Sequence, residues 1–132
     1  MDKERVHEVM KESNYKTFEK IPGVFVDLYH SGCFQIYYNS NSQVKYIELS
    51  EDIKNEFEVV YKEKNVFKTK VKDLITYIEK EVKYDREDPE VGCSYIFPEI
   101  DMSLWRPVID EEVYDCFESI GVGKEVTTVI KD

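Results

Sequence analysis

The chain has 132 residues, of which 42% are hydrophobic and 35% are charged, and its formal net charge is −10. This length and apolar content predict one packed domain and exclude a disordered chain. The negative charge argues against nucleic acids and anionic membranes as partners, and the sequence lacks an apolar run of the roughly 20 residues that a membrane helix needs.

The N-terminal region predicts one helix. Val6, Val9 and Met10 follow helical spacing, which predicts a helix over residues 2–14 with a narrow apolar stripe. A less regular stretch follows and ends at Pro22-Gly23. Because the chain starts with charged residues and not with the apolar core of a secretory signal, we expect a cytoplasmic location.

The next part of the chain predicts strands. Residues 24–30 and 33–38 are rich in β-branched and aromatic residues and are separated by Ser31-Gly32, so they predict a β-hairpin. Asn and Ser residues at 39–42 predict a turn after this hairpin. Further strands are predicted at residues 44–49, 57–61 and 66–67.

The clearest helical pattern lies at about residues 70–83, where apolar residues recur with 3.6-residue spacing and charged residues occupy the other side. These apolar residues are Val71, Leu74, Ile75, Ile78 and Val82. An acidic loop follows at residues 84–92. The remaining predicted strands are at residues 93–97, 102–105, 115–122 and 126–130.

Runs of strands joined by short turns, with only two helices, lack the strand–helix alternation that is typical of a parallel sheet. We therefore predict a single α+β domain over residues 1–132. It should contain a mainly antiparallel sheet of about 6–8 strands and two helices, at about residues 2–14 and 70–83.

Three cysteines, Cys33, Cys93 and Cys116, lie far apart in the sequence, each within a strand-like run. An odd number at wide spacing does not suggest a disulfide framework. We interpret them as reduced, buried side chains, which agrees with a cytoplasmic location.

The acidic residues are concentrated in one part of the chain. Between Tyr84 and Glu118 there are eleven acids and two bases, a net charge of −9. Such a concentration favours a basic partner, because complementary charge steers association. The acids that we expect to contact this partner are Asp85, Glu87, Asp88, Glu90, Asp110, Glu111, Glu112 and Asp115.

The only tryptophan, Trp105, is followed by Arg106, the second base of this acidic segment. Trp and Arg are enriched among the residues that contribute most to protein–protein binding, so both are added to the predicted partner-binding site. The alternative is structural: Trp105 would fill the core and Arg106 would pair with Glu118 or Asp101.

Catalytic and metal-binding patterns are weak. A cysteine nucleophile could be paired with His7 or His30, but no local motif supports such a pair. The acids of the 84–92 loop lack the spacing of an EF-hand, and the cysteines and histidines lack zinc-like spacing. Paired carboxylates could be drawn from Glu48, Glu99, Asp101 and Glu118, although exposed strand positions are often acidic without any catalytic role. We expect no metal and no other cofactor, and an enzyme is the less favoured interpretation.

Several sequence blocks resemble a set of small uncharacterised bacterial cytosolic proteins. The first half of the resemblance is the sequence from Phe34 to Glu48. The second half is more specific and comprises Phe97-Pro98-Glu99, Leu104-Trp105-Arg106-Pro107 and Phe117-Glu118-Ser119-Ile120-Gly121-Val122-Gly123. The resemblance implies a soluble single α+β domain and no particular activity. The first block is also distantly similar to a repeat in phagosome-assembly-factor-like proteins.

In size, acidity and expected architecture the chain also resembles immunity proteins that neutralise secreted toxins. We therefore expect a non-enzymatic protein-binding domain with an acidic face, and an immunity or antitoxin-like protein that blocks a basic partner is its most specific form. The alternative is a small enzyme or ligand-binding domain with a pocket between sheet and helices. A third hypothesis is a subunit that associates through an exposed sheet edge, and the oligomeric state stays open.

Overall fold

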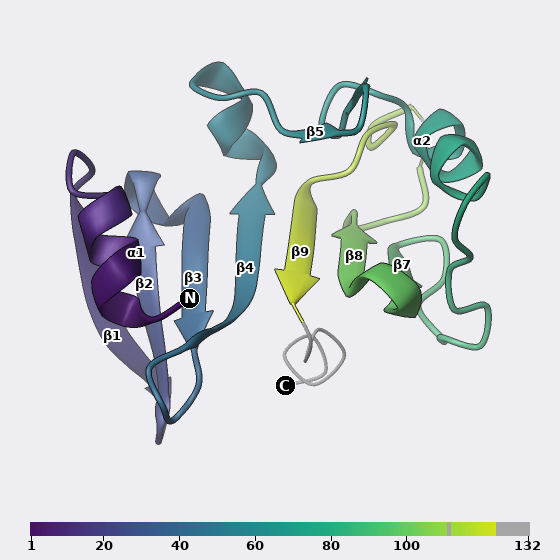
Figure 1. Cartoon of the computed structure of the whole chain (residues 1–132). Coiled ribbons are helices and arrows are strands. Elements are labelled where there is room, and N and C mark those ends of the chain that lie inside the picture. Colours follow the sequence, from purple (N-terminus) through teal and green to yellow (C-terminus); the bar gives the residue numbers. More distant parts are fainter. Residues whose placement is uncertain (111, 124–132) are drawn as a thin grey trace.

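A computed structural model describes residues 1–110 and 112–123. In these residues the main feature is a seven-stranded sheet in which every pair of neighbouring strands is antiparallel. In spatial order the strands are β1 (Tyr15–Ile21), β2 (Val24–Tyr29), β3 (Phe34–Tyr38), β4 (Val44–Ser50), β9 (Ser119–Gly123), β8 (Met102–Trp105) and β7 (Ser94–Phe97). Figure 1 shows this order, with β9 between the N-terminal and the C-terminal strands.

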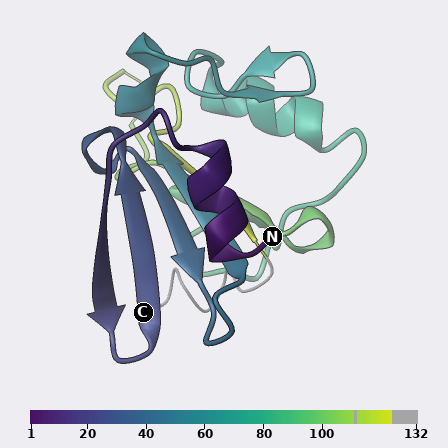
Figure 2. The ribbon, with the colours of Figure 1, turned by 60° about the vertical axis from the view of Figure 1, so that its left-hand side comes forward.

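Two helices complete the fold, α1 (Lys3–Val9) and α2 (Val71–Ile78), together with a small hairpin of β5 (Val60–Tyr61) and β6 (Lys64–Asn65). Figure 2 shows α1 in front of the N-terminal strands, with the small hairpin and α2 at the top of the view. The predicted α+β fold with a mainly antiparallel sheet and two helices is confirmed.

Both helices pack on the same face of the sheet. Val6 of α1 forms a buried cluster with Tyr29, Ile36 and Tyr38. The buried residues of α2 form a larger cluster with side chains of β7, β8 and β9. Strand pairing places Ile36 beside Ile47, then Val122, then Met102, so the two clusters share one face. The opposite face therefore has no helix over it in the described residues.

Both helices are shorter than predicted. Asp2 caps α1 by accepting a hydrogen bond from the backbone N–H of Arg5 at 2.8 Å, and the chain turns after Val9 to begin β1 at Tyr15. Helix α2 ends at Ile78 and continues as turns. The apolar spacing predicted the position of each helix correctly, but the predicted helices included the turns that follow. In these turns, isolated backbone hydrogen bonds still follow helical spacing.

The strand predictions also need corrections. The residues of β1 were predicted as an irregular stretch, but they form a strand. This strand lies at the edge of the sheet, is rich in charged residues and pairs with β2 alone, so its sequence lacks a clear strand pattern. Only Val60–Tyr61 of the predicted 57–61 strand is paired, and Val66 and Phe67 are not a strand but buried core residues beside α2. The predicted 115–122 strand starts at Ser119, and the predicted 126–130 strand lies outside the described residues.

Candidate functional site on the open face of the sheet

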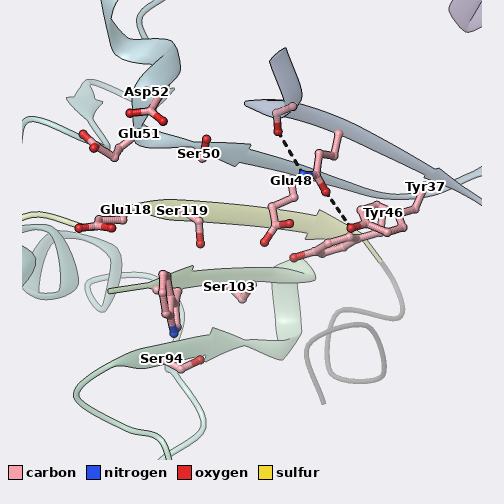
Figure 3. A pocket seen from close by; sticks show the side chains of 13 residues that line it. Tyr37, Tyr46, Glu48, Ser50, Glu51, Asp52, Ser94, Ser103, Glu118 and Ser119 are labelled. Atoms are coloured by element: carbon pink, nitrogen blue, oxygen red, sulfur yellow. Dashed lines mark hydrogen bonds between the residues drawn. The ribbon is translucent and has the colours of Figure 1, made fainter. Parts of the chain in front are cut away.

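The open face of the sheet contains a hollow of about 490 Å³. Its volume falls within the range of about 300–1,000 Å³ that is usual for recognition pockets. The described residues that line it are Gly32, Gln35, Tyr37, Tyr46, Glu48, Ser50, Glu51, Asp52, Ser94, Ser103, Trp105, Glu118 and Ser119. Figure 3 shows Glu51, Asp52 and Glu118 toward one end, Tyr37 and Tyr46 at the other, and Glu48 between them.

Strand pairing explains why these residues meet. Side chains alternate between the two faces of a strand, so residues paired across neighbouring strands share a face. One row across the sheet runs Ser50, Ser119, Trp105 and Ser94, from β4 to β7. The next row runs Gln35, Glu48, Gly121, Ser103 and Ile96. The hollow is therefore assembled from residues that are up to 87 positions apart in the sequence, Gly32 and Ser119.

Gly121 shapes the floor of the hollow. A Cβ atom at this position would overlap the hydroxyl and ring of Tyr46, so only glycine lets Tyr46 extend across β9. The hydroxyl of Tyr46 extends across β9 toward Ser103 on β8. Burial is the main reason that the pKa of Tyr46 is raised, so its hydroxyl stays protonated and available for hydrogen bonding.

A chain of hydrogen bonds holds Tyr37 beside Tyr46. Tyr37 donates from its hydroxyl to Oε1 of Gln35 at 2.8 Å, and Gln35 donates from Nε2 to the carbonyl of Gly32 at 3.1 Å. The rings of Tyr37 and Tyr46 are tilted against each other with centroids 5.6 Å apart. These contacts fix both tyrosines as walls of the hollow.

The charged residues that line the hollow in the described part of the chain all have one sign. Four carboxylates line it and, among its described lining residues, there is no lysine or arginine. Lys54 lies beside this group and pairs with Glu51 at 2.7 Å. Burial, followed by repulsion from Glu51 and Asp52, raises the pKa of Glu118, and attraction to Lys54 opposes part of this rise. Glu118 is therefore in an environment that disfavours its negative charge and would favour a nearby cation.

Ser94 contributes a polar group without a partner. Its side chain is 1% exposed, and its hydroxyl oxygen has no hydrogen-bond partner among the described residues. Buried hydroxyl groups are nearly always hydrogen-bonded, because losing water without replacement is unfavourable. Ser94 lies next to Trp105 in the pairing of β7 with β8 and lines the hollow.

The predicted acidic residues lie on two loops, before β7 and after β8. Asp85, Asp88 and Asp110 each accept a hydrogen bond from a backbone N–H two residues ahead, so these carboxylates also stabilise turns. Glu87, Glu90 and Glu112 are exposed, and Asp115 is half-buried. Glu111 lies outside the described residues.

Arg106 joins these two loops. It is 2% exposed, and its guanidinium donates to the carbonyls of Gly92 at 2.8 Å and Tyr114 at 3.0 Å. Its side chain therefore stabilises the loops and is not presented on the surface. Trp105 was predicted as a partner-binding residue and is 41% exposed at the edge of the hollow. None of the described predicted acids lines the hollow. The two acidic loops are connected to it in the chain through Ser94 of β7 and Trp105 of β8.

A second polar cluster fastens α1 to the sheet. The carboxylate of Asp27 is fully buried and interacts with Nε2 of His7 and the hydroxyl of Tyr38 at 2.7 Å each, and with the hydroxyl of Thr17 at 2.5 Å. Burial alone raises the pKa of Asp27, but these three hydrogen bonds and the charge of His7 outweigh it and leave the pKa below its usual value. This cluster lies on the helix-covered face, away from the hollow.

The residues required for the enzymatic alternative come together only in part. Glu48 and Glu118 line one hollow, but among its described lining residues there is no cysteine or histidine. His30 pairs with Glu56 at 3.0 Å, and the three cysteines are free. In the described part of the chain there is no group of three or more potential metal ligands from His, Cys, Asp and Glu.

Sequence reasoning missed most residues of the hollow. Ser94, Ser103 and Ser119 each appeared in a predicted strand, and Ser119 also lies in the Phe117–Gly123 block of the resemblance, but none was assigned to a site. Alternation of polar and apolar residues in β8 and β9 could have assigned these serines to one face. Their meeting with Glu48 depends on β9 pairing with β4, which local sequence does not specify.

Comparison with known proteins returned no matching family model, no matching curated protein and no matching solved structure. The resemblances drawn from the sequence blocks therefore stay predictions. None of the helices in the described residues has the length and apolar character needed to cross a membrane.

Proposed function

We propose that this domain binds a basic protein on the open face of its sheet. The observation that carries the proposal is the hollow itself, which four carboxylates line without a lysine or arginine among its described lining residues. Complementary charge raises the rate at which such a partner is captured, and exposed Trp105 offers an aromatic anchor beside it.

The acidic loops support the same proposal. They carry Glu87, Glu90 and Glu112 on the surface, and they are connected in the chain to Ser94 and Trp105, which line the hollow. A basic partner could therefore contact the loops and the hollow together. The most specific form of the proposal is an immunity or antitoxin-like protein that covers a basic site on its partner, acting in the cytoplasm.

The test compares two variants that remove the same number of charges. The hollow variant carries Glu48→Gln, Glu51→Gln, Asp52→Asn and Glu118→Gln. The remote variant carries Glu4→Gln, Glu12→Gln, Glu58→Gln and Glu63→Gln, at exposed positions that do not line the hollow. Each variant and the wild-type chain are used to capture proteins from an extract of the native host, with quantification by mass spectrometry.

We expect a basic protein that the wild-type chain and the remote variant retain and the hollow variant loses. With that protein purified, the association rate of the hollow variant should be about ten-fold lower at low salt, and its salt dependence should be flatter. Equal retention by the hollow variant would contradict the proposal.

The alternative, a domain that binds a small ligand, is favoured by one observation: the hollow combines aromatic walls with several hydroxyl and carboxylate groups. Mass spectrometry of the intact native chain under non-denaturing conditions distinguishes the two. A retained small molecule that the hollow variant loses would favour the ligand-binding alternative.

A further inference from the structure

Three features of the hollow point to one type of side chain. Trp105 exposes an aromatic ring at its edge, and Ser94 has a buried hydroxyl without a partner among the described residues. Glu118, which also lines the hollow, has a carboxylate in an environment that favours a nearby cation. In the sheet, Trp105 lies between Ser94 of β7 and Ser119 of β9, the residue that follows Glu118. An aromatic ring is thus flanked by hydrogen-bonding groups on both sides.

We propose that the hollow binds one arginine side chain of the basic partner, with the guanidinium stacked on Trp105 and donating to the Ser94 hydroxyl and the Glu118 carboxylate. This inference rests on the proposed function and specifies the residue that anchors the partner. The remaining carboxylates, Glu48, Glu51 and Asp52, line the same hollow, and Lys54 offsets part of the charge of Glu51.

Arginine fits this arrangement better than lysine does. A guanidinium is planar, stacks on aromatic faces and carries five N–H donors in fixed directions. It can therefore contact a ring with its face while its edge donates to acceptors on both sides of that ring. The lysine ammonium is a compact and strongly hydrated charge, so it would gain attraction to the carboxylates but little from Trp105.

Ser94 distinguishes this anchor from general attraction between opposite charges. An exposed acidic surface attracts any cation and does not require a buried hydroxyl. The hydroxyl of Ser94 has no partner among the described residues, so a donor that reaches it would satisfy a group that the folded chain leaves unpaired. Its loss should therefore weaken arginine binding and leave lysine binding nearly unchanged.

The test uses three peptides with blocked ends, so that only the central side chain differs: acetyl-Gly-Gly-Arg-Gly-Gly-amide and the same peptide with lysine or with citrulline. Citrulline has the shape of arginine without its charge. Binding to the full chain is followed by amide and indole N–H chemical shifts in NMR titrations.

We expect the arginine peptide to shift the signals of Ser94, Ser119 and the indole of Trp105. It should bind at least ten-fold more tightly than the citrulline peptide and several-fold more tightly than the lysine peptide. Ser94→Ala and Trp105→Leu should each reduce this preference over lysine, whereas the control Thr76→Ala, at an exposed position of α2, should not.

Equal affinity for arginine and lysine, or an arginine preference that survives both substitutions, would overturn the anchor while leaving the protein-binding proposal intact. Absence of shifts in the hollow with all three peptides would overturn it as well. The protein-binding proposal fails separately, through equal capture by the hollow variant, because that experiment uses no peptide.

Discussion

Gly121 lies in the middle of β9, where the side chain of Tyr46 crosses the strand. One wall of the hollow depends on this crossing, because Tyr46 lines the hollow there. A single glycine thus determines whether a buried aromatic residue can lie flat on the open face.

Gly121→Ala is expected to reduce the free energy of unfolding by about 1–3 kcal/mol, because the added methyl group overlaps Tyr46 and forces the ring to move. Urea unfolding followed by Trp105 fluorescence measures this loss. Adding Tyr46→Ala should relieve the overlap, so the double variant should lose less than the sum of the two single losses. Strict additivity would show that Gly121 and Tyr46 do not constrain each other.

At the scale of elements, the docking of α1 depends on a buried polar cluster as well as on apolar contacts. His7 reaches from the helix to Asp27 on β2, while Thr17 and Tyr38 approach Asp27 from β1 and β3. A buried carboxylate is tolerated here because hydrogen-bond donors from three elements surround it.

Asp27 should make stability depend on acid. Because its pKa is lowered in the folded chain, it stabilises the fold above about pH 4, where an unfolded aspartate is ionised, and this contribution disappears as the pH falls through the lowered pKa. Asp27→Asn should therefore be less stable than wild type at pH 5–6, and the difference should shrink below about pH 4. Urea unfolding at a series of pH values measures it, and a difference that does not change with pH would contradict this role.

The sequence predicted the presence of most helices and strands better than it predicted where they begin and end. The apolar spacing of Val71, Leu74, Ile75 and Ile78 identified α2 correctly, since all four residues are buried. Strand β1 was missed because an edge strand can be polar on much of its length and still pair through its backbone. Val66 and Phe67 show the reverse case, in which apolar residues enter the core from a turn.

From the sequence we could predict that the candidate site is acidic, but not most of the residues that form it. The sequence placed the acids of the two loops and Trp105 in a binding region, and Trp105 does line the hollow. Arg106 was interpreted as a surface residue because an Arg beside a Trp does not reveal burial, whereas its hydrogen bonds to Gly92 and Tyr114 require the folded loops. Glu48 and Glu118 meet only because β4 pairs with β9.

At the scale of the whole molecule, the two faces of the sheet differ. The helices cover one face of the sheet, and the other face carries the hollow with its four carboxylates. The acidic loops are connected in the chain to Ser94 and Trp105, which line the same hollow. Of the eleven acids between Tyr84 and Glu118, Glu118 is the one found among the described residues that line the hollow. At physiological salt, the potential of exposed charges extends over about 8 Å.

The most direct test of the central claim uses Trp105, the only tryptophan, as a probe of the potential in the hollow. Its fluorescence is quenched by caesium and by iodide at matched ionic strength, and each value is corrected against N-acetyl-tryptophanamide. We predict that caesium quenches more efficiently than iodide, that this preference falls sharply in the hollow variant and that it persists in the remote variant. Equal quenching by the two ions, or an equal loss of preference in both variants, would contradict an electronegative hollow on the open face of the sheet.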